Sequence, residues 1–139
     1  MDQCIFCKII KGEIPSVKIY EDDLVYAFLD INPINPGHVL VIPKEHHESS
    51  STVPEDVAGR LLHVGSRIGI ALKRGLDYDA FNLHLADGTA AGQVVMHVHL
   101  HVVPRGVEDN FRWNWRQIPY ASDEDRNDTA SKIQAKMKL

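Results

Sequence analysis

The chain has 139 residues, a length that fits a single domain over residues 1–139, and 44% of them are apolar, which is enough to build a core. Its net charge of −4 gives no basic field, which argues against a nucleic-acid polymer as partner but leaves a single nucleotide open. The sequence shows no secretory leader and no apolar run long enough for a membrane span, so we expect a cytoplasmic protein without a membrane partner.

Turn residues divide the first third of the chain into short elements. Gly12 and Pro15 end a first helical turn, and the acidic turn at 21–23 separates two runs that favour extended structure. We predict a helical turn, two hairpin strands, a loop and a β-branched strand, over residues 4–11, 17–21, 24–29, 30–37 and 38–43. His38 opens the last of these strands, a place where a histidine is more often structural than catalytic.

A long amphipathic helix is the clearest element of the sequence. Between Thr52 and Arg74 apolar residues recur at intervals of three and four, at Val57, Leu61, Val64, Ile68 and Leu72. Thr52 and Glu55 fit a capping box at its start, and Gly75 fits the C′ position after its end. We predict that this helix packs against the core.

A further strand and a loop of small residues follow the helix. Residues 82–86 alternate between polar and apolar and predict a strand. The loop over 87–93 has small residues whose backbone amides could approach an anion closely, although an ordinary hairpin loop explains it equally well. Gln93 is the loop side chain whose amide could donate into a neighbouring site.

Between Met96 and Arg105 histidine alternates with aliphatic residues. Because successive side chains of a strand point to opposite faces, one face should carry His97, His99 and His101, and the other Val98, Leu100 and Val102. Pro104 should end the strand, since it cannot donate a hydrogen bond to a neighbouring strand. Such a row could bind a metal, or it could present one nucleophilic imidazole between two that orient an anionic group.

The end of the chain predicts an aromatic loop and a polar helix. Phe111, Trp113 and Trp115 fall in the loop, where they could form a subunit contact or a stacking surface for a base. Ser122 and Asp125 are typical of a helix start, and we predict a C-terminal helix over about 122–137.

Two cysteines, Cys4 and Cys7, form a Cys-x-x-Cys motif. Two cysteines in one motif do not make the disulfide framework of a secreted domain, so metal binding or redox chemistry is the question they raise. Thioredoxin-like redox use is disfavoured, because no βαβ pattern follows the motif.

Four segments in order resemble the histidine triad family of nucleotide hydrolases and transferases, in its prokaryotic zinc-containing form: residues 4–10, 27–31, 37–44 and 91–105. The resemblance implies an α+β fold with an antiparallel sheet of about five strands, one long helix and a homodimer. It implies a purine nucleotide as substrate, in the form of a nucleoside phosphoramidate, a dinucleoside polyphosphate or an aminoacyl-adenylate-like compound. No organic cofactor is expected.

The same resemblance assigns catalytic roles. His99, the middle histidine of the row, would attack phosphorus and carry a transient nucleotidyl group that water then removes. His101 and His38 would donate hydrogen bonds to the phosphoryl oxygens and the bridging position, and Gln93 would donate to another phosphate oxygen.

The resemblance also implies nucleotide contacts. Asp30 would hold the ribose hydroxyls, Ile31 would flank the base, and Gly92 belongs to the phosphate loop. Two departures leave the branch of the family open. Ala86 stands where many members carry Asn, and Val94 stands where the phosphoramidase branch carries a Ser that can help to protonate an amine leaving group.

A structural zinc site is the last implication of the resemblance. Its ligands would be Cys4, Cys7, His46 and His97, two thiolates and two imidazoles in a closed tetrahedral site. His47 is the alternative to His46.

Two other hypotheses remain open at this point. The three histidines of the row could hold a catalytic zinc that activates water, which would give no covalent intermediate. Alternatively, the chain could be a nucleotide-binding regulatory or scaffold protein with vestigial turnover.

Overall fold

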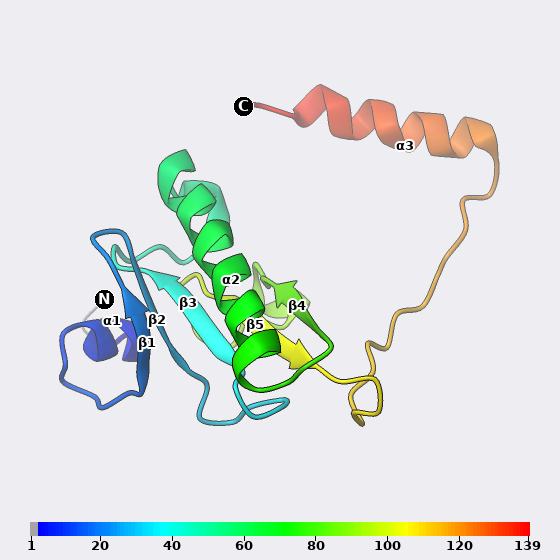
Figure 1. Cartoon of the computed structure of the whole chain (residues 1–139). Coiled ribbons are helices and arrows are strands. Elements are labelled where there is room, and N and C mark those ends of the chain that lie inside the picture. The colour runs from blue at the N-terminus through cyan, green and yellow to red at the C-terminus, as the bar shows by residue number, and fades with distance from the viewer. Residues whose placement is uncertain (1–2) are drawn as a thin grey trace.

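The computed structural model describes residues 3–139 and has a five-stranded antiparallel sheet in the order β1-β2-β3-β5-β4. The elements are α1 (Ile5–Ile10), β1 (Lys18–Glu21), β2 (Val25–Leu29), β3 (Val39–Pro43), η1 (Ser50–Thr52), α2 (Glu55–Gly75), β4 (Ala80–His84), η2 (Thr89–Ala91), β5 (Leu100–Arg105) and α3 (Asp123–Lys136). The predicted α+β class, with its five-stranded sheet, long helix and C-terminal helix, is confirmed (Figure 1). None of the described helices is long and apolar enough to cross a membrane.

Alternation along the central strands gives the sheet two apolar faces. One face packs under α2, which lies across the sheet in Figure 1, through Val25, Ala27, Val39, Val41, Leu100 and Val102. The opposite face packs against α1 through Tyr26, Phe28, Leu40 and Ile42, which meet Phe6 and Ile9. Full burial of one such side chain stabilises the fold by about 1.5–3 kcal/mol. Because Leu100 and Val102 face α2, the histidines between and beside them face the α1 side.

The strand that carries the histidine row differs from its prediction at both ends. β5 begins at Leu100, so the first two histidines of the row lie in the loop before it. Pro104 does not end the strand; it lies within β5, opposite Phe81 of β4. β3 pairs with β5 only as far as Val102, so beyond that point β5 has one bonded neighbour and a missing N–H is tolerated.

The long helix is confirmed, but both predicted caps are wrong. Pro54 is the N-cap of α2 and makes no side-chain capping bond. Thr52 instead ends η1, two residues before the N-cap, and its hydroxyl donates to the carbonyl of Ser49 at 3.1 Å. Gly75 is still helical, and the residue with a left-handed backbone after the helix is Asp77, with φ of 64°.

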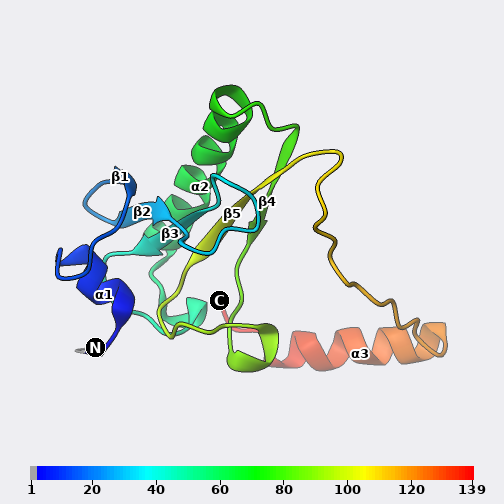
Figure 2. The same cartoon turned by 90° about the horizontal axis from the view of Figure 1, so that it is seen from below.

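The C-terminal helix begins as predicted. The side chain of Ser122 accepts a hydrogen bond from the backbone N–H of Asp125 at 3.0 Å, which caps α3. No residue of α3 is buried. Both views show α3 apart from the sheet, at the end of an extended segment (Figures 1 and 2).

Candidate active site and metal cluster

A pocket of about 470 Å³ opens on the α1 side of the sheet. Two histidines of the row, His99 and His101, line it. The rest of its wall is mostly apolar and includes Ile5, Phe6, Ile9, Ile14, Phe28, Leu29, Asp30, Ile31, Gly92 and Val94. An apolar pocket with a few convergent polar groups is typical of a small-molecule site.

The hydrogen bonds around His99 leave one ring nitrogen free to act. Nδ1 of His99 donates to the backbone carbonyl of His97 at 2.7 Å, so the proton sits on Nδ1 and Nε2 keeps its lone pair. His99 is 7% exposed, and burial lowers its pKa, which keeps the ring neutral at pH 7. The ring of Phe6 meets His99 edge-on, with centroids 5.2 Å apart. A neutral, oriented imidazole with a free lone pair is a competent nucleophile.

A second chain of hydrogen bonds fixes the tautomer of His101. The backbone N–H of Ile34 donates to Nδ1 of His38 at 3.1 Å, so the proton of His38 is on Nε2 and is donated to Nδ1 of His101 at 2.9 Å. The proton of His101 is therefore on Nε2, and that nitrogen is left for a ligand. Burial, followed by repulsion from His99 and His38, lowers the pKa of His101 to about 4. His38 is not part of the pocket wall and stands behind His101.

The amide of Gln93 is fully used by hydrogen bonds to three backbone groups. Its oxygen accepts from the backbone N–H of Gly88 at 2.7 Å, and its nitrogen donates to the carbonyls of Glu48 and Val95 at 2.8 and 3.2 Å. Gln93 is 3% exposed and is not part of the pocket wall. In this structure it holds the loop, and Gly92, with φ of 100°, is the residue that the loop presents to the pocket.

The loop after β2 brings the two remaining predicted nucleotide residues to the same pocket. Asp30 lines the wall, and its carboxylate accepts from the backbone N–H of Asn32 at 2.9 Å. Its backbone N–H donates to the carbonyl of His38 at 2.9 Å, which ties the loop to the start of β3. Ile31 is 90% exposed and lines the pocket as an apolar side chain open to solvent.

Cys4, Cys7, His46 and His97 bring their ligand atoms within 4.8 Å of one another and could hold a metal ion. Sγ of Cys4 lies 3.5 Å from Nδ1 of His97, Sγ of Cys7 lies 3.3 Å from Nδ1 of His46, and the two Nδ1 atoms lie 3.2 Å apart. The Zn–S and Zn–N bond lengths of a tetrahedral zinc site would place sulfur–nitrogen pairs about 3.6 Å apart and the nitrogen pair about 3.3 Å apart. The observed distances match these edges.

The surroundings of the cluster also fit a metal. Nε2 of His97 donates to the carbonyl of Pro43 at 2.8 Å, so its Nδ1 is unprotonated and its lone pair faces the thiols. Such a carbonyl behind a histidine is the usual support of a metal ligand. The neighbouring His47 turns elsewhere, since its Nδ1 contacts the hydroxyl of Thr52 at 3.0 Å. His46, as predicted, is the histidine that joins the cluster.

The histidine row is thus divided between two sites. His97 turns its ring to the thiols, whereas His99 and His101 line the pocket. Within residues 3–139 the three rings do not form one group of metal ligands. Asp30, His38 and His101 do bring ligand atoms within 4.8 Å: Nε2 of His38 donates to His101 at 2.9 Å and lies 3.7 Å from the carboxylate of Asp30.

His84 and Trp113 lie beside His101, although no role was predicted for His84. The register of β4 and β5 pairs His84 with His101, and their ring centroids are 5.7 Å apart. β4 spans Ala80–His84, two residues earlier than the predicted 82–86. Trp113 stacks on His84 with centroids 5.0 Å apart and an angle of 30° between the rings. Only the cross-strand register, which a single sequence does not reveal, could have found this pair.

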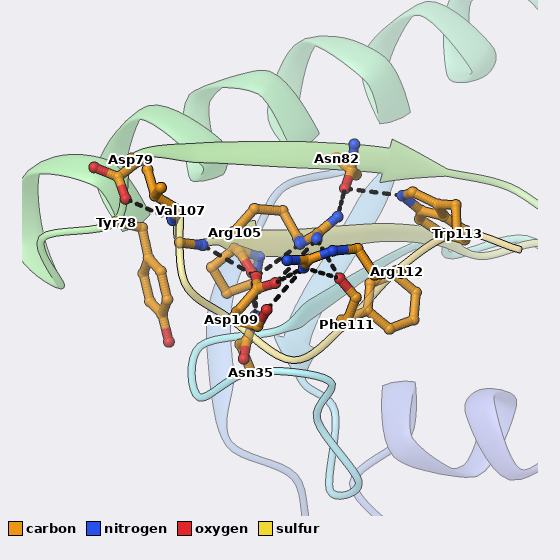
Figure 3. A network of polar contacts seen from close by, with 12 residues as sticks. Asn35, Tyr78, Asp79, Asn82, Arg105, Val107, Asp109, Phe111, Arg112 and Trp113 are labelled. Carbon is orange, nitrogen blue, oxygen red and sulfur yellow. Dashed lines mark hydrogen bonds and ion pairs between the residues drawn. The ribbon is translucent and has the colours of Figure 1, made fainter.

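A polar network centred on Arg105 fixes the segment that follows β5 (Figure 3). Arg105 donates to both carboxylate oxygens of Asp109, at 2.8 and 3.0 Å, and holds the pKa of that carboxyl well below its usual range. Arg105 also donates to the side-chain oxygen of Asn82 at 2.8 Å and to the carbonyl of Phe111 at 2.8 Å. The indole N–H of Trp113 donates to the same oxygen of Asn82 at 3.2 Å.

Curated relatives of the chain include named enzymes. An uncharacterised HIT-like protein of Borreliella burgdorferi is 53% identical over 113 residues, which are 80% of this chain and 81% of that protein. An adenosine 5′-monophosphoramidase of Candida albicans is 43% identical, over 73% of this chain and 70% of that protein. An adenylylsulfatase of Arabidopsis thaliana is 42% identical, over 78% of this chain and 55% of that protein.

Solved structures and a family model agree with these relatives. A HIT family protein from Bacillus anthracis is 40% identical, covers 99% of both chains and superposes with a TM-score of 0.91. A zinc-bound histidine triad family protein from Mycobacterium smegmatis is 36% identical over 98% of this chain and 99% of that chain, with a TM-score of 0.77. The HIT domain model matches residues 11–107, so the chain belongs to the HIT domain family.

Proposed function

We propose that the chain is a nucleotidyl hydrolase or transferase that cleaves a phosphorus-linked leaving group from a nucleoside 5′-monophosphate through a covalent nucleotidyl-His99 intermediate. The observation that carries the proposal is the hydrogen bond from Nδ1 of His99 to the carbonyl of His97, which leaves the lone pair of Nε2 beside the pocket. The relatives named as an adenosine 5′-monophosphoramidase and an adenylylsulfatase support it.

In the first step Nε2 of His99 attacks phosphorus. A bond forms between phosphorus and Nε2, and the bond from phosphorus to the leaving group breaks with its electron pair. The His99 ring then carries a positive charge, which the carbonyl of His97 stabilises through Nδ1–H. Nε2–H of His101 donates a hydrogen bond to a non-bridging phosphoryl oxygen, and His38 holds His101 in that tautomer.

In the second step water attacks the same phosphorus. The bond from phosphorus to Nε2 breaks, His99 recovers its neutral ring, and the proton of the water passes to solvent. Dividing one displacement into two gives water an easier target than the original phosphoanhydride or phosphoramidate.

The nucleoside part of a purine nucleotide would lie in the apolar part of the pocket. Asp30 would accept hydrogen bonds from the ribose hydroxyls, Ile31 would flank the base, and the backbone of Gly92 would approach a phosphate. All three residues line the pocket with His99. For Gln93 the buried amide supports a role in holding the phosphate loop.

We also propose that the Cys4, Cys7, His46 and His97 cluster binds structural zinc. The distances within the cluster and the zinc-bound neighbour from Mycobacterium smegmatis support this assignment. Elemental analysis of protein purified without added metal should give one zinc per chain, and Cys4→Ser should lower that ratio. His47→Ala is the matched control and should retain the metal. A Cys4→Ser variant with full zinc content would contradict the assigned ligands.

The chain is further proposed to act as a homodimer. α3 has no buried residue and stands apart from the sheet in both views, which leaves it free to pack on a second copy (Figures 1 and 2). Light scattering should give the mass of two chains, and truncation after Ala121 should weaken the assembly. A mass of one chain for the full-length protein would reject the dimer.

The covalent intermediate is tested by rapid quench at neutral pH and intact-mass analysis. Wild type should gain one adenylyl group from adenosine phosphoramidate or diadenosine tetraphosphate, and His99→Ala should gain none. Product without an adduct would point to direct attack by water. Neither adduct nor product would favour a nucleotide-binding protein without turnover.

A further inference from the structure

We propose that Cys4 and Cys7 are also a modification site, at which a peroxide oxidises the two thiols to a disulfide, releases the metal and weakens nucleotide binding in the neighbouring pocket. The inference rests on the proposed function and on the proposed zinc cluster. It adds a redox-sensitive contact between the cluster and the pocket, which neither site requires by itself.

The two thiols are placed to react with each other and with a small oxidant. Cys4 is the N-cap of α1, and its Sγ accepts a hydrogen bond from the backbone N–H of Cys7 at 3.4 Å. The ligand atoms of the cluster, both sulfur atoms included, all lie within 4.8 Å of one another. Both cysteines are partly exposed, whereas His97 is 0% exposed, so the cluster is open to a small oxidant on the side of the cysteines.

The oxidation balances with one molecule of peroxide. One thiolate attacks a peroxide oxygen, the O–O bond breaks with its electron pair, and the sulfur becomes a sulfenic acid. The second thiolate then attacks that sulfur, a sulfur–sulfur bond forms, and hydroxide leaves. Together the sulfur atoms lose two electrons, and the peroxide is reduced to two molecules of water with protons from solvent. A disulfide sulfur carries no thiolate charge, so it no longer binds the metal.

Phe6, which lies between the two cysteines in the sequence, ties the cluster to the nucleophile. Its ring meets His97 of the cluster edge-on with centroids 5.9 Å apart, and it meets His99 in the same way at 5.2 Å. The backbone carbonyl of His97 also accepts from Nδ1 of His99 at 2.7 Å. A change in the ligands of the cluster therefore reaches His99 through a packed ring on one side and a hydrogen bond on the other.

The helix that carries the thiols is also one wall of the pocket. Ile5, Phe6 and Ile9 of α1 line the pocket together with His99. α1 has only six residues, and so short a helix has little stability of its own. Because its N-cap is a ligand of the cluster, a bound metal would fix the start of the helix, and loss of the metal would loosen this wall.

Titration of the purified protein with hydrogen peroxide tests the modification. Both free thiols should disappear together, one zinc should be released for each pair, and the intact mass should fall by two hydrogen atoms. Since the chain has two cysteines, a thiol count reports on this cluster alone. Dithiothreitol with added zinc should restore the thiols and the metal. Addition of oxygen to single cysteines without a disulfide would overturn the proposal.

Calorimetry with adenosine monophosphate tests the effect on the pocket. Oxidation should weaken its binding to wild type by about 2- to 12-fold, the range of one aromatic contact, and dithiothreitol with zinc should reverse the change. Met96→Leu removes an oxidisable side chain that is 40% exposed beside His97, and as the matched control it should respond like wild type. Phe6→Leu should release zinc as wild type does, but its affinity should change less on oxidation.

The outcomes separate this inference from the proposals on which it rests. Zinc release with an unchanged affinity for adenosine monophosphate would overturn the coupling and leave the zinc cluster in place. Protein purified without zinc, whose affinity still falls reversibly on oxidation, would reject the zinc and support the redox-sensitive contact. An equal change in Phe6→Leu and wild type would overturn the link through Phe6. Reduced protein that does not bind adenosine monophosphate would reject the proposed function and the inference together.

Discussion

Replacing Gln93 by Leu distinguishes a side chain that holds the loop from one that binds the substrate. The substitution removes three hydrogen bonds, from Gly88 and to Glu48 and Val95, at a position that is 3% exposed. At about 1 kcal/mol for each bond, the free energy of unfolding should fall by about 3 kcal/mol. For a domain of this size the melting temperature should fall by roughly 10 °C.

Thermal unfolding followed by circular dichroism, together with kcat and KM, is the measurement. Val94→Ala is the control, because Val94 is 89% exposed and its truncation should change stability by less than about 0.5 kcal/mol. An unchanged melting temperature with a large fall in kcat would refute the reasoning. The amide of Gln93 would then have to face the substrate during the reaction.

Three further predictions concern the helix, the histidines and the metal. Gly69→Ala should destabilise the protein by about 1–2 kcal/mol in urea unfolding, because its Cβ would lie 2.5 Å from the ring of Phe81. Gly59→Ala, with no atom within 4 Å, should stabilise it by about 0.5–1 kcal/mol. If Gly69→Ala were the more stable of the two variants, the ring of Phe81 would have to move away from the new methyl group. Stability should fall as the pH is lowered from about 6.5 towards 4. Burial lowers the pKa of His101 to about 4, so in this range the unfolded chain binds a proton that the folded chain excludes, a loss on the order of 3 kcal/mol in full. His101→Gln should show a shallower dependence, and an equal slope would assign the effect to other groups. Chelation should lower the melting temperature of wild type and leave that of Cys4→Ser almost unchanged. An unchanged melting temperature of wild type in the presence of the chelator would mean that the fold does not depend on a metal in this cluster.

The sequence predicted the features that depend on local geometry. The direction of a side chain in a strand is set by its place in the alternation, so the placement of His101 opposite Leu100 and Val102 followed directly. The spacing of apolar residues likewise identified the face of α2 that packs on the sheet. The resemblance added the grouping of His46 with the two cysteines, which no spacing rule would have given.

What the sequence missed depends on contacts between distant segments. The neighbour of His101 on β4 is decided by the cross-strand register, so the predicted strand contained His84 but did not indicate that it pairs with His101. Gln93 looked free to donate into the site, but the carbonyl of Glu48, 45 residues away, takes its amide proton. Pro104 is tolerated within β5 because β3 begins only at Val39, opposite Val102, which is a property of the sheet and not of the residue.

His97 contacts the cysteine thiols with its side chain and His99 with its backbone carbonyl. The imidazole of His97 faces the thiols, whereas its main-chain carbonyl orients His99. Every amino acid has that carbonyl, but few have a side chain that binds a metal. If a descendant of this chain lost both cysteines, position 97 could therefore drift to another residue and still hold the nucleophile in its tautomer. A histidine at this position would then reflect the proposed metal cluster, and its loss in a homologue would say little about whether that homologue retains the proposed chemistry at the position of His99.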